Sequence, residues 1–205
     1  MPTKVVVFSD FICPFCYIGM RTLRGLQPEF GFEIQWRGFQ IHPEWPAEGV
    51  PAERYYRTMS EERRQSAWQM IESMAAEAGL QMRPPSVLAN SYAALAAQEF
   101  AVEQGRGDAF EERVYRAYFR DQANIGDRSL LLELAREVGL DASALQTALA
   151  EDRYAMRIKN TALAAHQRGI SGVPTFIIGD YPIVGAQSAE VMRQVLEQAA
   201  QIGAK

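Results

Sequence analysis

The stretch KVVVFSDFICPFC, residues 4–16, decides the fold of this chain. The short β-branched run Lys4–Ser9 predicts a buried strand. Pro14 suits the first position of a helix, where a missing N–H costs nothing. Cys13 and Cys16, the only two cysteines, therefore stand at a strand-to-helix turn, with Cys13 at the N-cap position. A Cys-x-x-Cys motif placed in this way is typical of a redox site.

The position of the two thiols predicts different roles for them. The free backbone N–H groups of Phe15 and Cys16 point back toward the Cys13 sulfur, and the positive end of the helix dipole adds to them. Both effects favour an exposed Cys13 thiolate with a pKa well below that of free cysteine. Such a thiolate attacks a disulfide, and Cys16, one turn later and less exposed, resolves the mixed disulfide.

Two other interpretations of the cysteines are weaker. Inert, buried cysteines would stand at a strand-to-helix turn only by chance. A zinc site would need further ligands, and the remaining histidines, His42 and His166, lie far apart without finger-like spacing. We therefore expect redox chemistry and no metal.

Composition narrows the class of protein. The 205 residues, 48% of them hydrophobic and 22% charged, suit a globular chain with a sizeable core. The net charge of −4 and the lack of a basic block argue against nucleic acid or an anionic membrane as partner. Met1–Lys4 leads directly into the first strand without a signal-peptide pattern, and no apolar run is long enough to span a bilayer. We therefore expect a cytoplasmic protein, a compartment in which a dithiol is more often catalytic than structural.

The order of predicted elements is β-α-β, then helices, then α-β-β-α. The first part has a helix from Pro14 to Gln27, ended by Pro28, and a second strand over 32–39. A loop follows from Ile41 to Pro51. Helical patterns then dominate, and the predicted helices are Ser60–Ala78, Ser86–Gln104, Asp108–Arg120, Asp127–Gly139 and Ala142–Ala150. The last part has a helix Arg153–Arg168, strands Thr175–Ile178 and Pro182–Val184, and a helix capped by Ser188 that reaches Gln201.

An aromatic stripe lies on the helix Asp108–Arg120, with Phe110, Tyr115 and Tyr118 at helical spacing. Such a stripe could line a cofactor-binding site, but a packed helical core explains it better.

Gly172-Val173-Pro174-Thr175 is the second informative site. A proline before a strand commonly has a trans peptide bond. Together with the Cys-x-x-Cys motif and the order of elements, however, it predicts a cis Val173–Pro174 bond. The Val173 backbone would then lie beside the cysteines, where it could pair with an extended substrate.

With these features the chain resembles the DsbA-like superfamily of thioredoxin-fold oxidoreductases, specifically its FrnE-like branch. The resemblance rests on Ser9-Asp10 before Cys13–Gly19 and on several later groups, which are Tyr115–Phe119, Ile125–Asp127, Gly172–Phe176 and Val184–Gln187. It implies an α/β thioredoxin fold with a large all-helical insertion. The thioredoxin-like domain would comprise residues 1–58 and 151–205, and the insertion residues 59–150.

The resemblance also implies an activity and a site. Cys13 would be the nucleophile, Cys16 the resolving thiol and Pro174 the cis-proline. Substrate would contact Pro14, Phe15, Val173, Pro174 and Thr175. Protein or small-molecule thiols and disulfides would be the partners. Apart from the redox-active Cys13–Cys16 disulfide no cofactor is expected, with glutathione a candidate co-substrate.

Two positions depart from the patterns of such enzymes, and two further residues could tune the thiols. Many of them carry a buried acid six positions before the first cysteine, where this chain has Val7. Asp10 is the only carboxylate near the motif, and it either tunes the thiols or, as we favour, accepts hydrogen bonds in the turn. Phe15 stands where DsbA has a histidine, so the extreme oxidising power of DsbA is not expected. His42 could approach the site from its loop, although an exposed loop histidine is the simpler expectation.

Two further functions stay open. Within the superfamily, 2-hydroxychromene-2-carboxylate isomerases and kappa-class glutathione transferases use glutathione and usually have serine at the first motif position. The intact Cys13/Cys16 pair argues against them. A non-catalytic binding module on the same scaffold would have thiols of ordinary reactivity. The sequence leaves the oligomeric state open.

Overall fold

The computed structural model describes residues 3–203, and the side chains of residues 3–201. The chain forms two compact units, Met1–Ile41 with Thr161–Lys205, and His42–Asn160. The predicted insertion, residues 59–150, lies inside the second unit, which begins earlier and ends later than that segment. Side-chain contacts within the second unit explain the wider bounds, since Trp45 packs on Tyr55 and Arg157 pairs with Glu99.

The first unit contains a four-stranded sheet with the strand order β2-β1-β5-β6. β1 pairs in parallel with β2 and antiparallel with β5, and β5 pairs antiparallel with β6. The strands are β1 (Lys4–Ser9), β2 (Glu33–Gly38), β5 (Thr175–Ile178) and β6 (Tyr181–Val184). The predicted order β-α-β followed by α-β-β-α is confirmed.

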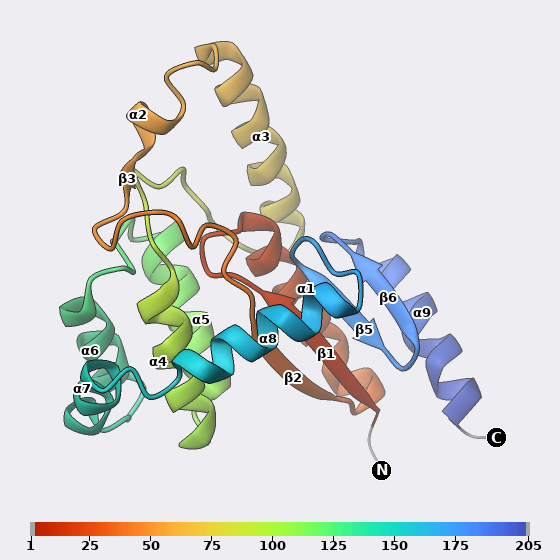
Figure 1. The fold of residues 1–205 in the computed structure, drawn as a ribbon. Helices are drawn as coiled ribbons and strands as arrows, with labels where there is room; N and C mark the ends of the chain where they lie inside the picture. Colours follow the sequence, from red (N-terminus) through yellow and green to blue (C-terminus); the bar gives the residue numbers. More distant parts are fainter. Residues whose placement is uncertain (1–2, 204–205) are drawn as a thin grey trace. The chain divides into compact units, whose positions relative to one another are not determined.

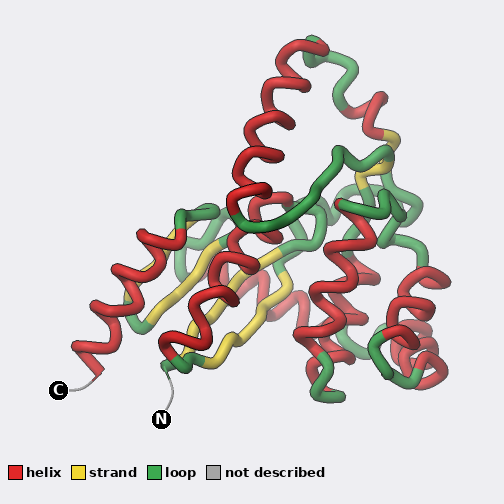
Figure 2. Tube along the Cα trace, turned by 180° about the vertical axis from the view of Figure 1, so that it is seen from behind, coloured by secondary structure: helices red, strands yellow, loops and turns green. Residues whose placement is uncertain are grey.

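Helices cover both faces of this sheet (Figures 1 and 2). Val5 and Val7 point to the face that carries α1 (Pro14–Phe30) and α9 (Ala189–Gly203), where they join the core with Leu23 of α1 and Met192 of α9. Phe8 points to the opposite face, where it packs with Ala165 of α8 (Ala155–Gln167). The alternation of β1 therefore divides its side chains between two apolar layers.

The first helix is longer than predicted. Pro28 lies inside α1, which continues to Phe30, and Gly31 ends it in the left-handed conformation with φ 64°. The Gly31 N–H donates to the Gln27 carbonyl at 2.8 Å, and the Gln27 side chain donates to the Phe32 carbonyl at 2.9 Å. These bonds satisfy the end of the helix beyond Pro28, so the prediction that Pro28 ends it is wrong.

The second unit is mostly helical. Its elements are β3 (Val50–Pro51), α2 (Ala52–Tyr55), α3 (Glu61–Glu77), β4 (Val87–Leu88), α4 (Tyr92–Glu103), α5 (Gly107–Phe119), α6 (Arg128–Glu137) and α7 (Ala142–Ala150). Asp127 and Asp141 cap α6 and α7 with their side chains, as predicted. Helix α4 begins at Tyr92 rather than at the predicted Ser86, because residues 87–88 pair antiparallel with Val50–Pro51.

Helices α4 to α7 pack against one another around one core. The aromatic stripe of α5 lies in it, since Phe110, Tyr115, Tyr118 and Phe119 are all buried. The prediction of a packed core, rather than a cofactor site, is confirmed for these side chains.

Candidate active site

The sheet brings the two predicted motifs to the same edge. β1 ends just before the cysteine turn, and β5 begins just after Pro174. Because the two strands are antiparallel neighbours, with Phe8 opposite Thr175, the end of one lies beside the start of the other. Cys13 and Val173, 160 positions apart, meet there.

A tight turn carries the chain from β1 into α1. The Cys13 N–H donates to the Asp10 carbonyl at 3.2 Å, and Cys13 itself has the extended conformation of an N-cap residue, with φ −89° and ψ 114°. Pro14 occupies the first helical turn. The predicted position of Cys13 at the helix N-terminus is thus confirmed. Both cysteines are free thiols.

The prediction that the Cys13 thiolate is exposed is wrong, because Cys13 is only 7% exposed. Its Sγ donates to the Val173 carbonyl at 3.6 Å, so the backbone before Pro174 lies over the sulfur. Cys16 is completely buried, which agrees with its predicted lower exposure. The Val173–Pro174 peptide bond is cis, as predicted.

The two thiols have pKa values shifted in opposite directions. The pKa of Cys13 is lowered, chiefly because the Cys16 thiol donates a hydrogen bond to its sulfur, with further help from the backbone N–H groups of Cys16 and Phe15. Burial and the charge of Asp10 oppose this shift. The pKa of Cys16 is raised well above its usual value, first by burial and then by the hydrogen bond and charge of Cys13. This asymmetry makes Cys13 the first thiol of the pair to ionise.

Asp10 supports the turn, as favoured from the sequence. Its fully buried carboxylate accepts from the Ile41 N–H at 2.8 Å and from the Ile12 N–H at 3.5 Å. Asp10 also affects both thiols. Its charge raises the pKa of Cys13, and its own N–H lies 3.5 Å from the Cys16 sulfur. Asp10 therefore combines the two roles that the sequence presented as alternatives.

The hydrogen bond between Ser9 and Cys16 was not predicted from the sequence. It is fully buried, and its hydroxyl donates to the Cys16 sulfur, which lowers the pKa of that thiol. From the sequence, Ser9 counted only as part of the Ser9-Asp10 group that carries the family resemblance, with no role predicted at the thiols, because only the fold turns the chain back onto this sulfur.

The residues predicted to bind substrate occupy different environments. Pro14, Phe15 and Val173 are half-buried around Cys13, whereas Pro174 and Thr175 are buried. The Thr175 hydroxyl donates to the Gly172 carbonyl at 2.8 Å, so its side chain holds the turn before β5.

His42 is placed in the second unit, where its contacts are local. The imidazole stacks on Trp45, with ring centroids 3.9 Å apart, and Nδ1 lies 2.8 Å from a Glu44 carboxylate oxygen. This bond lowers the pKa of Glu44. The ring is therefore held by its own loop.

Two findings on the described residues bear on metal binding and membrane insertion. No group of three or more His, Cys, Asp or Glu side chains in residues 3–201 could hold a metal ion. None of the described helices has the length and apolar character needed to cross a membrane.

Two relatives match this chain over nearly its whole length. The Bacillus subtilis (strain 168) protein YwbO is 33% identical over 201 residues, which are 96% of each chain. The structure of a probable DsbA oxidoreductase from Streptomyces coelicolor superposes with a TM-score of 0.91 and 31% identity, over 97% of this chain and 90% of that one.

More distant structures show the fold alone. A 2-hydroxychromene-2-carboxylate isomerase matches with a TM-score of 0.81 and 19% identity, over 98% of both chains. The cytosolic disulfide reductase DsbM from Pseudomonas aeruginosa, solved with GSH, matches with a TM-score of 0.69 and 20% identity, also over 98% of both.

The model of the DSBA-like thioredoxin domain family matches residues 4–197. Its span, with the two close relatives, shows that this chain belongs to the DSBA-like thioredoxin domain family.

Proposed function

We propose that the chain is a cytoplasmic thiol-disulfide oxidoreductase or disulfide isomerase of the FrnE-like branch, with Cys13 as nucleophile and Cys16 as resolving thiol. One observation carries the proposal: the pKa of Cys13 is lowered while that of Cys16 is raised, at a helix N-terminus beside a cis-proline. A dithiol in which one member ionises first is suited to ordered disulfide exchange.

In the first step the Cys13 thiolate attacks one sulfur of a substrate disulfide. The substrate S–S bond breaks, and its other sulfur leaves as a thiolate that takes a proton from solvent. Pro14, Phe15 and the backbone of Val173 surround the reacting sulfur and would contact the substrate. The Val173 carbonyl, which accepts from the Cys13 thiol in the free protein, becomes available to a substrate N–H once that proton is gone. Pro174 fixes this backbone, and Thr175, whose side chain is buried, would contribute through its backbone.

In the second step Cys16 attacks the Cys13 sulfur and expels the substrate as a second thiol. Two causes of the high Cys16 pKa, the hydrogen bond and the charge of Cys13, disappear once Cys13 is in a mixed disulfide. The donors from Ser9 and Asp10, which lower the Cys16 pKa, remain. Loss of the Cys16 proton to solvent is therefore easier after the first step than before it. Two electrons pass to the substrate, and the protein is left with a Cys13–Cys16 disulfide.

Two thiols must then reduce that disulfide, and we propose glutathione as their source. The GSH-containing structure of the Pseudomonas aeruginosa neighbour supports this choice. Because a lowered thiol pKa stabilises the reduced form, the potential should lie above that of thioredoxin, about −270 mV, and below that of DsbA, about −120 mV. Equilibration against glutathione measures it.

The proposal is tested with Cys13→Ser and Cys16→Ser, which serve as controls for each other. With an excess of a disulfide-bonded peptide, Cys16→Ser should accumulate a peptide–protein mixed disulfide, whose mass is measured on the intact protein. Cys13→Ser should form none under the same conditions. Both variants should be inactive in catalysed reduction of insulin. Equal trapping by the two variants, or trapping only by Cys13→Ser, would contradict the assigned roles.

A glutathione-dependent isomerase is the second candidate, favoured by the fold that the chain shares with 2-hydroxychromene-2-carboxylate isomerase. Cys13→Ser separates the two functions. Disulfide exchange should vanish in this variant, whereas an isomerisation that uses the glutathione thiol would survive the change.

A further inference from the structure

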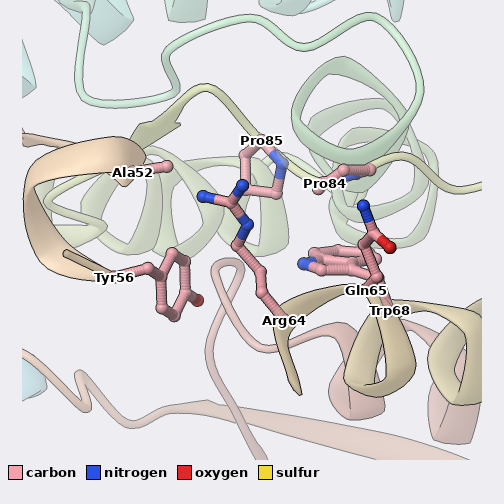
Figure 3. A pocket seen from close by; sticks show the side chains of 7 residues that line it. All are labelled: Ala52, Tyr56, Arg64, Gln65, Trp68, Pro84 and Pro85. Atoms are coloured by element: carbon pink, nitrogen blue, oxygen red, sulfur yellow. The ribbon is translucent and has the colours of Figure 1, made fainter. Parts of the chain in front are cut away.

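The second unit contains a cavity of about 340 Å³ that no cysteine lines. Helix α2, the first half of α3 and the Pro84-Pro85 segment form it, and Figure 3 shows its side chains. Its size is near the lower end of the range for small-molecule sites, which is roughly 300–1,000 Å³. The cavity is therefore large enough for one ring system with a short substituent.

Flat apolar surfaces form most of its walls. Tyr56 and Trp68 lie on either side of the Arg64 side chain, and Pro84 and Pro85 lie across from them (Figure 3). Aromatic side chains and prolines are flat surfaces on which a planar ring packs well. The walls thus favour a planar ligand over a branched aliphatic one.

Contacts outside the cavity hold these walls in place. Tyr56 packs against Tyr55 with ring centroids 5.0 Å apart, and Tyr55 packs against Trp45 at 5.4 Å. On the other side, the Pro84 carbonyl accepts from the Gln122 amide at 2.9 Å. Because these side chains are already held in place, less conformational entropy is lost when a ligand binds.

Arg64 is the one charged residue of the lining. Its guanidinium forms no hydrogen bond or ion pair with any residue between 3 and 201, where the structure gives contacts. Glu61, one turn earlier, does not neutralise it, since its carboxylate accepts instead from the Gln65 amide at 3.1 Å. In Figure 3 the guanidinium extends toward Ala52 and Pro85, at the cavity. A half-buried, unpaired guanidinium between apolar walls favours an anionic ligand group.

We propose that this cavity binds a small aromatic carboxylate. The ring packs between Trp68 and the prolines across from it, Pro84 and Pro85, and the carboxylate pairs with Arg64. A carboxylate is chosen because its two coplanar oxygens match the planar fork of a guanidinium. This binding is independent of the disulfide exchange proposed for Cys13.

Cinnamate is the probe, and cinnamamide, of the same shape but neutral, is the matched ligand. Binding to the full chain is measured by titration calorimetry and by ligand-observed NMR. Wild type should bind cinnamate at least tenfold more tightly than cinnamamide. Arg64→Gln should weaken cinnamate by about tenfold, the value of roughly one charge-assisted hydrogen-bonded pair, and leave cinnamamide unchanged.

Arg63→Gln is the control, because Arg63 is the exposed neighbour of Arg64 on α3 and does not line the cavity. It should bind cinnamate as wild type does. Trp68→Ala should lose both ligands, with circular dichroism confirming that it is folded. Cys13→Ser should bind cinnamate normally, so failure of the disulfide chemistry would leave this result unaffected.

Three results would overturn the proposal. The first is that wild type fails to bind millimolar cinnamate. The second is that Arg64→Gln and Arg63→Gln bind it equally well. The third is a wild-type dimer that Trp68→Ala converts to monomers, without cinnamate binding to either, which would mean that a second copy of the chain fills the cavity.

Discussion

Replacing Cys16 should slow the reaction of Cys13 through a hydrogen bond rather than through the loss of a resolving thiol. The largest cause of the lowered Cys13 pKa is the hydrogen bond from the Cys16 thiol. Cys16→Ala removes this donor, whereas Cys16→Ser retains an O–H at nearly the same place. The two variants therefore differ mainly in the stabilisation of the Cys13 thiolate.

The expected size of the effect follows from the burial of the pair. A hydrogen bond to a charged group contributes about 1.5–3 kcal/mol. Since Cys13 is only 7% exposed and Cys16 is completely buried, water does not readily replace that donor. At a fixed pH below the Cys13 pKa, this energy corresponds to a fall in the thiolate fraction of about 10- to 150-fold. A more basic thiolate is also a better nucleophile, with a Brønsted slope of about 0.4–0.5, which offsets nearly half of the change on a logarithmic scale. The alkylation rate should therefore fall by about 3- to 20-fold.

The assay is alkylation of the reduced variants by iodoacetamide as a function of pH, followed by mass spectrometry. Only Cys13 remains to react in either variant, so the rate reports one thiol. The ultraviolet absorbance of the thiolate gives its pKa independently. Cys16→Ala should show a raised Cys13 pKa and the slower rate, and Cys16→Ser should lie between it and wild type.

Equal rates for Cys16→Ala and wild type would refute this reasoning. In that case the helix N-terminus and its backbone donors would account for the whole shift. A Cys16→Ser variant as slow as Cys16→Ala would show that the hydroxyl does not reach the sulfur.

Three further predictions follow from the first unit. Asp10→Asn should lower the Cys13 pKa further, because the carboxylate charge raises it, and a pKa from alkylation against pH that does not fall would mean that Asp10 acts only on the turn. Gly19→Ala should lower the free energy of unfolding by about 1–3 kcal/mol in denaturant titration, since a Cβ there would lie 2.7 Å from the buried Phe176 ring. Gly25→Ala in the same helix has open space around it and should raise the free energy of unfolding by about 0.5–1 kcal/mol. Equal effects of the two changes would contradict this packing. The Cys13 pKa is lower in the folded protein than in the unfolded chain. The stability that Cys13 contributes should therefore be complete above the unfolded pKa of about 8.5 and be lost as the pH falls through the folded value. Free energies of unfolding of reduced wild type and Cys13→Ser, measured by denaturation across that pH range, would contradict this if their difference did not change with pH.

Local signals in the sequence predicted much of the fold. The strand Lys4–Ser9 and the helix Ala142–Ala150 have the predicted bounds, the second because the Asp141 side chain caps its first turn. Patterns of this kind act between residues a few positions apart, which is why they are legible in one sequence. The N-cap position of Cys13 was predictable for the same reason, since a strand, a turn and a proline stand in direct succession.

Contacts between distant residues decided what the sequence did not show. Helix α4 begins at Tyr92 because β4 pairs with β3, some forty positions earlier. Cys13 is buried because the antiparallel pairing of β1 with β5 lays the Val173 carbonyl against its sulfur.

The difference between the pKa values of the two thiols also depends on the tertiary structure. The sequence placed Cys13 at a helix N-terminus, which alone favours its thiolate. Burial of Cys16, the donor from Ser9 and the opposing charge of Asp10 depend on how the chain folds back onto the motif. Local pattern therefore predicted which thiol ionises first, and tertiary structure decided how buried the two thiols are and which groups tune them, because desolvation and charge act through space rather than along the chain.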